Sequence, residues 1–370
     1  MRILYVTTIS MTMMFFPEQV KRLLAEGHSV DIATNMTDPL IPAYDSMDVK
    51  VHHIPFSRSP FSRDNLTAYR QLKKLVEQEH YDIVHCHTPN AAMVTRLACR
   101  KVRKQGTRVI YTAHGFHFFK GASLKNWLMF YPVEKFCSYF TDTLITINSE
   151  DYALAQKKMH AKEVRYVPGV GIDVSRISVV SVDRRKKRAE IGVPEDAVLL
   201  LSIGELNVNK NHQVVLHALS QIKEVVEQNN IHYAIAGAGD QEQNLLNLAE
   251  SLGLKDRFHL LGYRKDALEL YKAADVFVFP SYREGLSVSL MESMASGLPA
   301  VVSKIRGNVD LIDGEGGVHC DPFKPETFAD AICKMTDGTT RETMGTHNKE
   351  AVRKFSLQNV LDEMGKIYKI

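Results

Sequence analysis

Along its whole length, this 370-residue sequence alternates short apolar runs with amphipathic stretches that are long enough to form helices. The expected strands are residues 3–7, 29–34, 49–54, 83–87, 109–112 and 143–147, then 198–203, 232–236, 258–261, 276–279 and 300–302. The expected helices of the first half are residues 17–26, 66–79, 91–104 and 152–159. Nearly continuous apolar strands joined by helices are typical of a parallel sheet covered on both faces. The sequence therefore predicts an α/β fold of two doubly wound, Rossmann-like domains.

The length is about right for two domains. We expect the boundary within residues 166–182, which contain a proline, two glycines and few strand-forming residues. The expected domains are residues 1–170 and 171–355, followed by a C-terminal helix at 356–370 that packs back on the first domain. The charged run at 183–190 opens the second half. We interpret it as a solvated helix face, with contact to an anionic membrane as the alternative.

Charge and cysteine content limit the class of protein. The net charge of +3 is too small to indicate a nucleic-acid partner. Residues 1–180 nevertheless hold 23 Lys and Arg against 16 Asp and Glu, so an anionic surface or acceptor should meet the first half. Five cysteines without a CxxC pair argue against disulfides or a zinc site. We expect no signal peptide and no membrane span, hence a cytoplasmic protein, with peripheral contact to the inner face of the plasma membrane left open.

The segment 279–303 carries the most chemical information. An apolar strand ends near residue 280, a loop holds Glu284 and Gly285, and a helix is expected from about 287 to 296. Gly297 and Pro299 then end the helix. Glu284 and Glu292 can line one crevice at the carboxyl end of the strand, where the helix amides favour a phosphate or the oxygens of a sugar.

Two glutamates eight residues apart are not informative alone. Here, however, Glu284 and Glu292 lie within an expected strand, turn and helix that follow one another in that order, and the helix ends at Gly297. The segment resembles the Glu-x7-Glu motif of family 4 retaining glycosyltransferases, which use nucleotide sugars and have the two-domain GT-B fold, with the domains facing a cleft. The resemblance extends over residues 200–219, 236–254 and 258–281, and over the histidine segments 82–89 and 112–119. It is closest to bacterial capsule and exopolysaccharide transferases.

The resemblance implies a role for each matching residue. Glu292 would bind the ribose hydroxyls and Glu284 the donor sugar, while Lys210 would neutralise the diphosphate. His114 would reach the donor sugar from the other domain, which makes His114, Glu284 and Lys210 the implied catalytic residues. The remaining implied donor contacts are Gly204, Gly262, Tyr263, Arg264, Gly285, Leu286 and Ser287.

Two positions depart from the family pattern. Glu205 stands where the family commonly has an arginine on the diphosphate, so Lys210 would act alone or with Arg306 or Arg283. The loop at 8–20 has Met and Phe in place of a Gly-Gly pair, which limits a close backbone approach to phosphate.

The expected function is transfer of a sugar, with retention, from a nucleoside-diphosphate sugar, expected to be a UDP-sugar, to a saccharide acceptor. The acceptor is expected to be lipid-linked and to serve capsular or exopolysaccharide synthesis. No DxD-like metal motif is present, so we expect no metal and no other cofactor. A hydrolysing UDP-sugar 2-epimerase and a non-catalytic partner subunit remain alternatives.

Two further segments have open interpretations. His85 and His87 flank Cys86, and we expect one histidine to face the crevice and the other the core. Residues 116–140 are rich in aromatic side chains with interspersed lysines. They form either a core helix with a loop or a surface that approaches a lipid-linked acceptor at a membrane.

Overall fold

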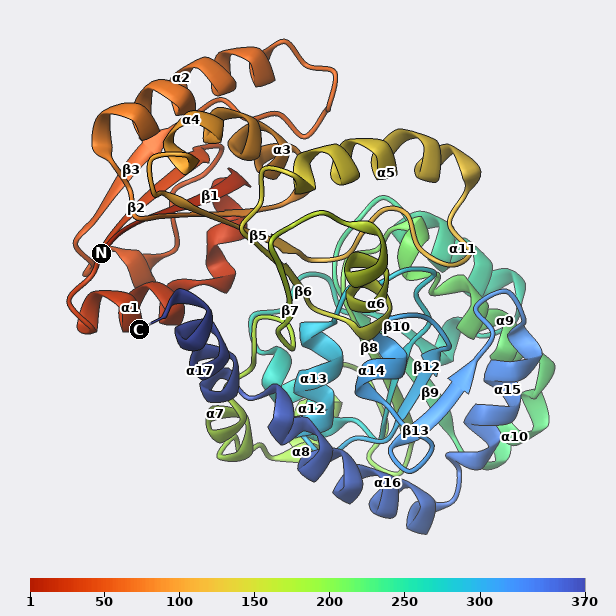
Figure 1. The fold of residues 1–370 in the computed structure, drawn as a ribbon. Coiled ribbons are helices and arrows are strands. Elements are labelled where there is room, and N and C mark those ends of the chain that lie inside the picture. The colour runs from red at the N-terminus through yellow and green to blue at the C-terminus, as the bar shows by residue number, and fades with distance from the viewer. Residues whose placement is uncertain (370) are drawn as a thin grey trace. The chain divides into compact units, whose positions relative to one another are not determined.

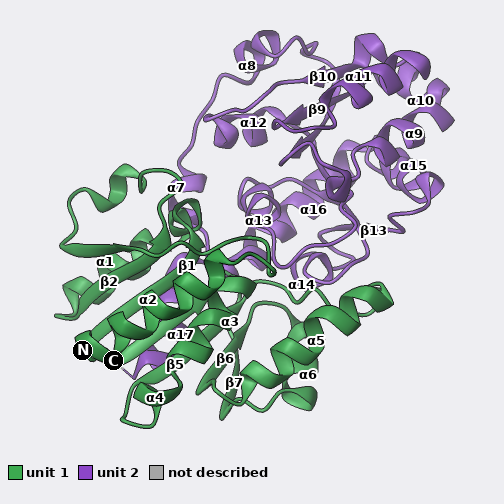
Figure 2. Ribbon diagram, turned by 90° about the horizontal axis from the view of Figure 1, so that it is seen from above, with its two compact units in different colours: residues 1–170 green, residues 171–370 purple. Residues whose placement is uncertain are grey.

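A computed structural model describes residues 1–369 of the chain, which divides into two compact units, Met1–Val170 and Gly171–Ile370 (Figure 2). Each unit contains one parallel β-sheet with helices on both faces (Figure 1). The predicted class of two doubly wound α/β units is confirmed.

The first unit is built on a seven-stranded sheet with the order β3-β2-β1-β4-β5-β6-β7. Its strands are β1 (Arg2–Ile9), β2 (Ser29–Asn35), β3 (Val49–His53), β4 (Ile83–His87), β5 (Arg108–Ala113), β6 (Thr143–Thr146) and β7 (Glu163–Tyr166). Its helices are η1 (Ser10–Phe15), α1 (Pro17–Ala25), η2 (Pro42–Tyr44), α2 (Asp64–Glu79), α3 (Pro89–Ala98), α4 (Arg100–Arg103), α5 (Leu124–Ser138) and α6 (Ser149–Lys158). The central strand β1 is buried on both faces, which explains the apolar run at residues 3–6.

The second unit has a six-stranded sheet with the order β10-β9-β8-β11-β12-β13. Its strands are β8 (Val198–Ile203), β9 (Ile231–Ala236), β10 (Phe258–Leu260), β11 (Val276–Phe279), β12 (Ala300–Ser303) and β13 (Gly317–Cys320). The helices before and between its first strands are α7 (Val174–Ser178), α8 (Arg184–Glu190), η3 (Val208–Lys210), α9 (Gln213–Gln221), α10 (Lys223–Gln228), α11 (Glu242–Ser251), η4 (Lys255–Arg257) and α12 (Ala267–Ala273). Those that follow are α13 (Val288–Ala295), α14 (Asn308–Leu311), α15 (Pro325–Lys334), α16 (Gly338–Ala351), η5 (Val352–Phe355) and α17 (Leu357–Tyr368).

Both sheets reverse their winding beside the first strand. After β1 the chain adds β2 and β3 on one side, and then β4 on the other side of β1. In the second unit β9 and β10 lie on one side of β8 and β11 lies on the other. In open parallel sheets, ligands bind outside the carboxyl ends of the strands at such a reversal. The ends of β1 and β4, and of β8 and β11, are therefore the places to look for a site.

Sequence patterns miss the edge strands β7 and β13. Strand β7 contains Glu163 and Arg165 and has no fully buried residue, so it lacks the apolar run on which the prediction depends. Strand β13 is four residues long and has only its two end residues buried. In both cases pairing with a neighbouring strand, rather than composition, determines the extended backbone.

The interpretation of residues 183–190 as a solvated face is wrong for two of its charges. The side chain of Lys187 is only 9% exposed, and its Nζ lies 2.8 Å from Asp266 and 2.7 Å from Glu269. Arg188 is 2% exposed, lies 2.6 Å from Asp275 and donates to the carbonyl oxygens of Ala273, Glu195 and Ala197. These two cations fix α8 to its own unit, so neither can contact a membrane.

The aromatic segment 116–140 has both buried and exposed side chains. Phe116 and Phe118 are buried in the core of the first unit. Helix α5 instead leaves large apolar side chains at its outer surface, of which Leu128 is 69% and Phe136 is 55% exposed. Within residues 1–369, no helix combines the length and the apolar composition needed to cross a membrane.

Candidate functional site

Lys210 and Glu284 meet at the winding reversal of the second unit. Lys210 ends η3, which follows β8, and Glu284 lies in the loop that follows β11. The Lys210 Nζ lies 2.8 Å from the Glu284 Oε1 and 4.6 Å from the centre of the Phe279 ring. The two side chains are 18% and 15% exposed, so the ion pair is partly buried but open to an incoming ligand.

Hydrogen bonds tie the two loops directly to each other. The Tyr282 backbone N–H donates to the Asn209 carbonyl over 2.8 Å, and the Asn209 side-chain amide donates to the Arg283 carbonyl over 3.0 Å. Arg306, which is 6% exposed, donates from Nε to the Glu284 carbonyl over 3.1 Å. Arg306 therefore holds the backbone of the Glu284 loop.

The loop continues into the first turn of α13. Ser287 caps this helix, because its Oγ accepts the Leu290 N–H over 3.3 Å. Gly307, at φ +78°, packs so tightly here that a Cβ atom would lie 2.0 Å from the Gly285 carbonyl oxygen. The amides in the first turn of a helix have no partner within it, and the helix dipole adds positive potential there. The segment Gly285, Leu286 and Ser287 thus leads into an anion-binding helix end.

Glu292 lies one turn further along α13 and has a different environment from Glu284. The Tyr271 hydroxyl donates to the Glu292 Oε2 over 3.1 Å. Burial raises the pKa of the Glu292 carboxyl, whereas the Tyr271 hydrogen bond and the charge of Arg176 oppose this shift. The carboxylate is positioned to accept hydrogen bonds from hydroxyl groups. Tyr271 was not predicted, because a contact across 21 residues leaves no local pattern.

The remaining predicted donor residues lie around the ends of β8 and β10. A Cβ atom on Gly204 would lie 3.3 Å from the Lys210 Cε, so the glycine gives the lysine stem its space. The Gly262 carbonyl accepts the Gly237 N–H over 2.8 Å. Tyr263 is 77% exposed. Arg264 is engaged by Asp266 and Glu190, so this segment offers a ligand its backbone and the Tyr263 ring rather than a free cation.

Glu205 does not disturb the Lys210 charge. Its side chain is exposed and accepts the Asn207 amide over 2.9 Å. Lys210 keeps Glu284 as its ion-pair partner. The lysine therefore supplies the positive charge at the reversal. The α13 amides follow Glu284 in the chain, at the end of the loop after β11.

In the first unit, His114 follows the end of β5 and contacts His87 at the end of β4. The His87 Nδ1 lies 3.1 Å from the His114 Nε2. His85 and His87 lie on the same face of β4 with ring centres 4.1 Å apart, and both are buried, so the expectation that one of them faces a crevice is wrong. Alternate residues of a strand share a face, and Cys86 takes the other one. Burial lowers the pKa of His114 to about 4 and that of His87 well below 6.5, so both rings are neutral at pH 7.

A hydrogen bond between two neutral imidazoles requires one donor and one acceptor. The His87 Nε2 is buried without a hydrogen-bond partner. The centre of the His87 ring lies 4.3 Å from that of Phe16 and 5.7 Å from that of Tyr5. An orphaned buried N–H is rarer than an orphaned acceptor. The favoured arrangement therefore has the proton of His87 on Nδ1, donated to His114, and the proton of His114 on its own Nδ1.

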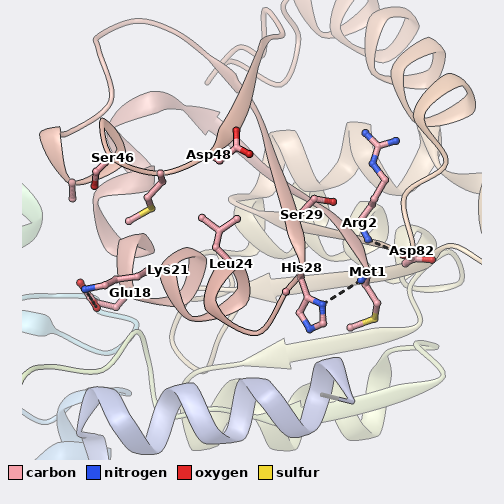
Figure 3. A pocket seen from close by; sticks show the side chains of 13 residues that line it. Met1, Arg2, Glu18, Lys21, Leu24, His28, Ser29, Ser46, Asp48 and Asp82 are labelled. Atoms are coloured by element: carbon pink, nitrogen blue, oxygen red, sulfur yellow. Dashed lines mark hydrogen bonds and ion pairs between the residues drawn. The ribbon is translucent and has the colours of Figure 1, made fainter.

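One hollow of the first unit lies at the opposite end of its sheet. It encloses about 1030 Å³ and is formed by side chains from α1, the turn before β2 and the start of β1 (Figure 3). Several of its polar groups have partners: the Met1 amine contacts His28, the Arg2 backbone N–H donates to Asp82, and Lys21 lies 3.9 Å from Glu18. A hollow at the amino ends of the strands is not where parallel sheets bind ligands.

We expect His87→Phe to remove the bond that selects the His114 tautomer while keeping a ring in the aromatic packing. His87→Asn keeps an N–H near the position of Nδ1 and serves as the matched control. In ¹⁵N-labelled protein, the wild type and His87→Asn should show His114 protonated on Nδ1, and His87→Phe should show a mixture of tautomers. An unchanged His114 spectrum in His87→Phe would contradict the assigned arrangement.

Comparisons with known proteins identify the family of the chain. Residues 183–351 match the family model "Glycosyl transferases group 1", and residues 2–148 match "Glycosyl transferase 4-like". EpsD of Bacillus subtilis, which is named as a glycosyltransferase, is 40% identical over 319 residues, covering 85% of this chain and 83% of its own. A relative in Escherichia coli, "UDP-Gal:alpha-D-GlcNAc-diphosphoundecaprenol alpha-1,3-galactosyltransferase", is 29% identical over 307 residues, covering 80% and 77%.

Solved structures show the same fold at lower identity. Anabaena Alr3699/HepE, in complex with UDP and glucose, has a TM-score of 0.81 and 18% identity over 100% of this chain and 99% of its own. The match covers both units, as expected for the GT-B fold. The chain thus belongs to the group 1, family 4-like glycosyltransferases.

Proposed function

We propose that this glycosyltransferase transfers a sugar, with retention of anomeric configuration, from a UDP-sugar to a saccharide acceptor. The observation that carries the proposal is the Lys210–Glu284 pair, 2.8 Å apart, at the winding reversal and beside the first turn of α13. A lysine and helix amides match a diphosphate, and carboxylates match sugar hydroxyls. The E. coli relative is named for a UDP-sugar donor, and HepE binds UDP and glucose.

In the proposed reaction the donor diphosphate takes Lys210 as its partner, which releases Glu284 to bind the hydroxyls of the donor sugar. Glu292, held by Tyr271, binds the ribose. The bond from the anomeric carbon to the phosphate oxygen breaks as the acceptor oxygen approaches on the same face. The departing phosphate oxygen takes the proton of the acceptor hydroxyl. Negative charge grows on the UDP during this step, and Lys210 stabilises it more strongly in the transition state than in the ground state.

His114 completes the proposed site from the first unit. With its proton on Nδ1, it donates a hydrogen bond to the donor sugar rather than acting as a base.

We also propose that no metal ion takes part. The positive charge that a divalent cation would bring to the diphosphate is supplied here by Lys210 and the α13 amides. Within residues 1–369, no three His, Cys, Asp or Glu side chains gather as a metal site requires.

A panel of UDP-, GDP-, ADP- and TDP-sugars, each tested with EDTA present, checks the donor and the metal together. One UDP-sugar should raise the melting temperature most and be slowly hydrolysed to UDP and a sugar of unchanged configuration. Glu292→Ala should weaken its binding, because the ribose loses its acceptor. Activity that disappears in EDTA and returns with Mn²⁺ would overturn the metal-free proposal. Release of an epimerised free sugar would instead identify a 2-epimerase.

For the acceptor, we propose a lipid-linked saccharide in exopolysaccharide or capsule synthesis, met at the cytoplasmic face of a membrane. The E. coli relative is named for a diphosphoundecaprenol acceptor. Helix α5 and the residue that follows it expose large apolar or aromatic side chains: Leu124, Leu128, Val133 and Phe136 of the helix, and Tyr139 after it. A basic residue adjoins the C-terminal end of α5, where the Arg100 guanidinium lies 4.6 Å from the centre of the Phe140 ring. Apolar side chains beside a cation suit an anionic bilayer surface.

Liposome flotation tests this surface. The protein should float with anionic vesicles and much less with neutral ones, and Leu128→Asp with Phe136→Asp should abolish flotation. Leu246→Asp, which changes an exposed leucine of the second unit, should have no effect. Equal recovery with and without anionic lipid would remove the membrane proposal and leave the donor site untouched.

A further inference from the structure

A second hollow in the first unit lies at the carboxyl end of the sheet, where β1 and β4 part. We name it the β1–β4 hollow. It encloses about 260 Å³, near the lower end of the ~300–1,000 Å³ typical of small-molecule sites. Its lining consists of Thr8, Ile9, Thr12, Arg58, Pro60, Thr88, Pro89, Asn90, His117 and Phe130. It therefore occupies, in the first unit, the position that the Lys210–Glu284 pair occupies in the second.

Hydrogen bonds shape the walls of this hollow. The Thr88 Oγ1 accepts the Thr8 backbone N–H over 3.1 Å, and the two threonine hydroxyls lie 2.6 Å apart, which joins the ends of β1 and β4. The Asn90 side-chain amide donates to the carbonyl oxygens of Ser57 and Arg58 over 2.9 and 2.6 Å. The Arg58 backbone is thus held at the rim by contacts that do not involve its side chain.

The lining of the β1–β4 hollow also includes two aromatic side chains, His117 and Phe130. Phe130 of α5 lies with its ring centre 4.6 Å from that of His117. An aromatic surface facing a few fixed hydroxyl and amide groups is the composition of a small polar-ligand site, and it suits a pyranose, which has an apolar C–H face and hydroxyls at its edge. The helix that supplies Phe130 also carries the exposed apolar side chains described above.

Arg58 differs from the structural arginines of this unit. Arg2, Arg96 and Arg103 each lie 2.9 Å from a carboxylate, of Glu79, Glu134 and Asp142 respectively. Arg58 is exposed and makes no ion pair in the described part of the chain. It also lines an adjoining hollow of about 430 Å³, with which the β1–β4 hollow shares Ile9. An arginine without a carboxylate partner, at the rim of a sugar-sized hollow, is suited to a phosphate.

We propose that the β1–β4 hollow binds the reducing-end sugar of the acceptor as its 1-phosphate ester, with the ring against Phe130 and the phosphate on Arg58. This inference rests on the proposed function, since a glycosyl phosphate is the head of a lipid-linked saccharide. The exposed apolar side chains of α5 then lie on the same helix as the sugar contact. Recognition of the sugar and of its phosphate therefore depends on different side chains.

The test uses the full-length protein and three probes: N-acetylglucosamine 1-phosphate, methyl N-acetylglucosaminide and inorganic phosphate. Calorimetry should give the tightest binding for the sugar phosphate. Arg58→Gln should reduce that affinity about tenfold, to the level of the neutral glycoside, since a charge-assisted hydrogen bond is lost. Phe130→Leu should weaken both sugar probes alike. Arg63→Gln is the matched control, because Arg63 is an exposed arginine nearby that lines neither hollow.

UDP binding, measured on the same samples, separates this inference from the proposed function. Unchanged UDP affinity in all three variants, with probe binding altered as described, supports the inference. Equal affinity of wild type and Arg58→Gln for the sugar phosphate would overturn it, and so would inorganic phosphate binding as tightly as the sugar phosphate. Either of these results, together with normal UDP binding, would leave the donor site standing.

Discussion

The proposed chemistry depends on one partly buried ion pair, Lys210–Glu284, held at the point where the second sheet reverses its winding. An ammonium and a carboxylate this close stabilise each other, and neither can be lost without leaving the other unpaired in a poorly solvated place. In the proposed reaction, a diphosphate replaces Glu284 as the partner of Lys210, which frees the carboxylate for sugar hydroxyls. The bonds through Asn209 and Arg306 matter because they fix the two loops relative to each other.

The two units supply different chemistry. The second unit offers a cation, helix amides and two carboxylates in separate environments, which suits a charged nucleotide and its sugar. The first unit offers neutral histidines and, in our further inference, a sugar-sized hollow with Arg58 at its rim. The excess of basic residues in the first half of the sequence is consistent with an acceptor that carries negative charge.

Much of this arrangement could be predicted from the sequence, because strands, the Ser287 cap and the Gly297 stop leave local patterns. Lys210 and Glu284 could be named as site residues only because their segments resemble those of family 4 glycosyltransferases. The hydrogen-bond partners of the site residues could not be predicted. Tyr271 contacts Glu292, and Arg306 contacts the Glu284 loop, only because the fold brings these distant segments together. The faces of His85 and His87 were predicted wrongly although strand periodicity contains the answer. Lys187 and Arg188 are buried by the packing of α8, which a run of charges does not reveal.

The most direct test of the central claim is the affinity of UDP and of its cognate UDP-sugar for Lys210→Met and Glu284→Gln, measured by calorimetry in EDTA. Lys210→Met should lose about 10–100-fold for both ligands, since hydrogen bonds to a charged group contribute ~1.5–3 kcal/mol. Glu284→Gln should bind UDP at least as tightly as the wild type, because nothing competes for Lys210, yet lose the added affinity of the sugar. Wild-type UDP affinity in Lys210→Met would contradict the account.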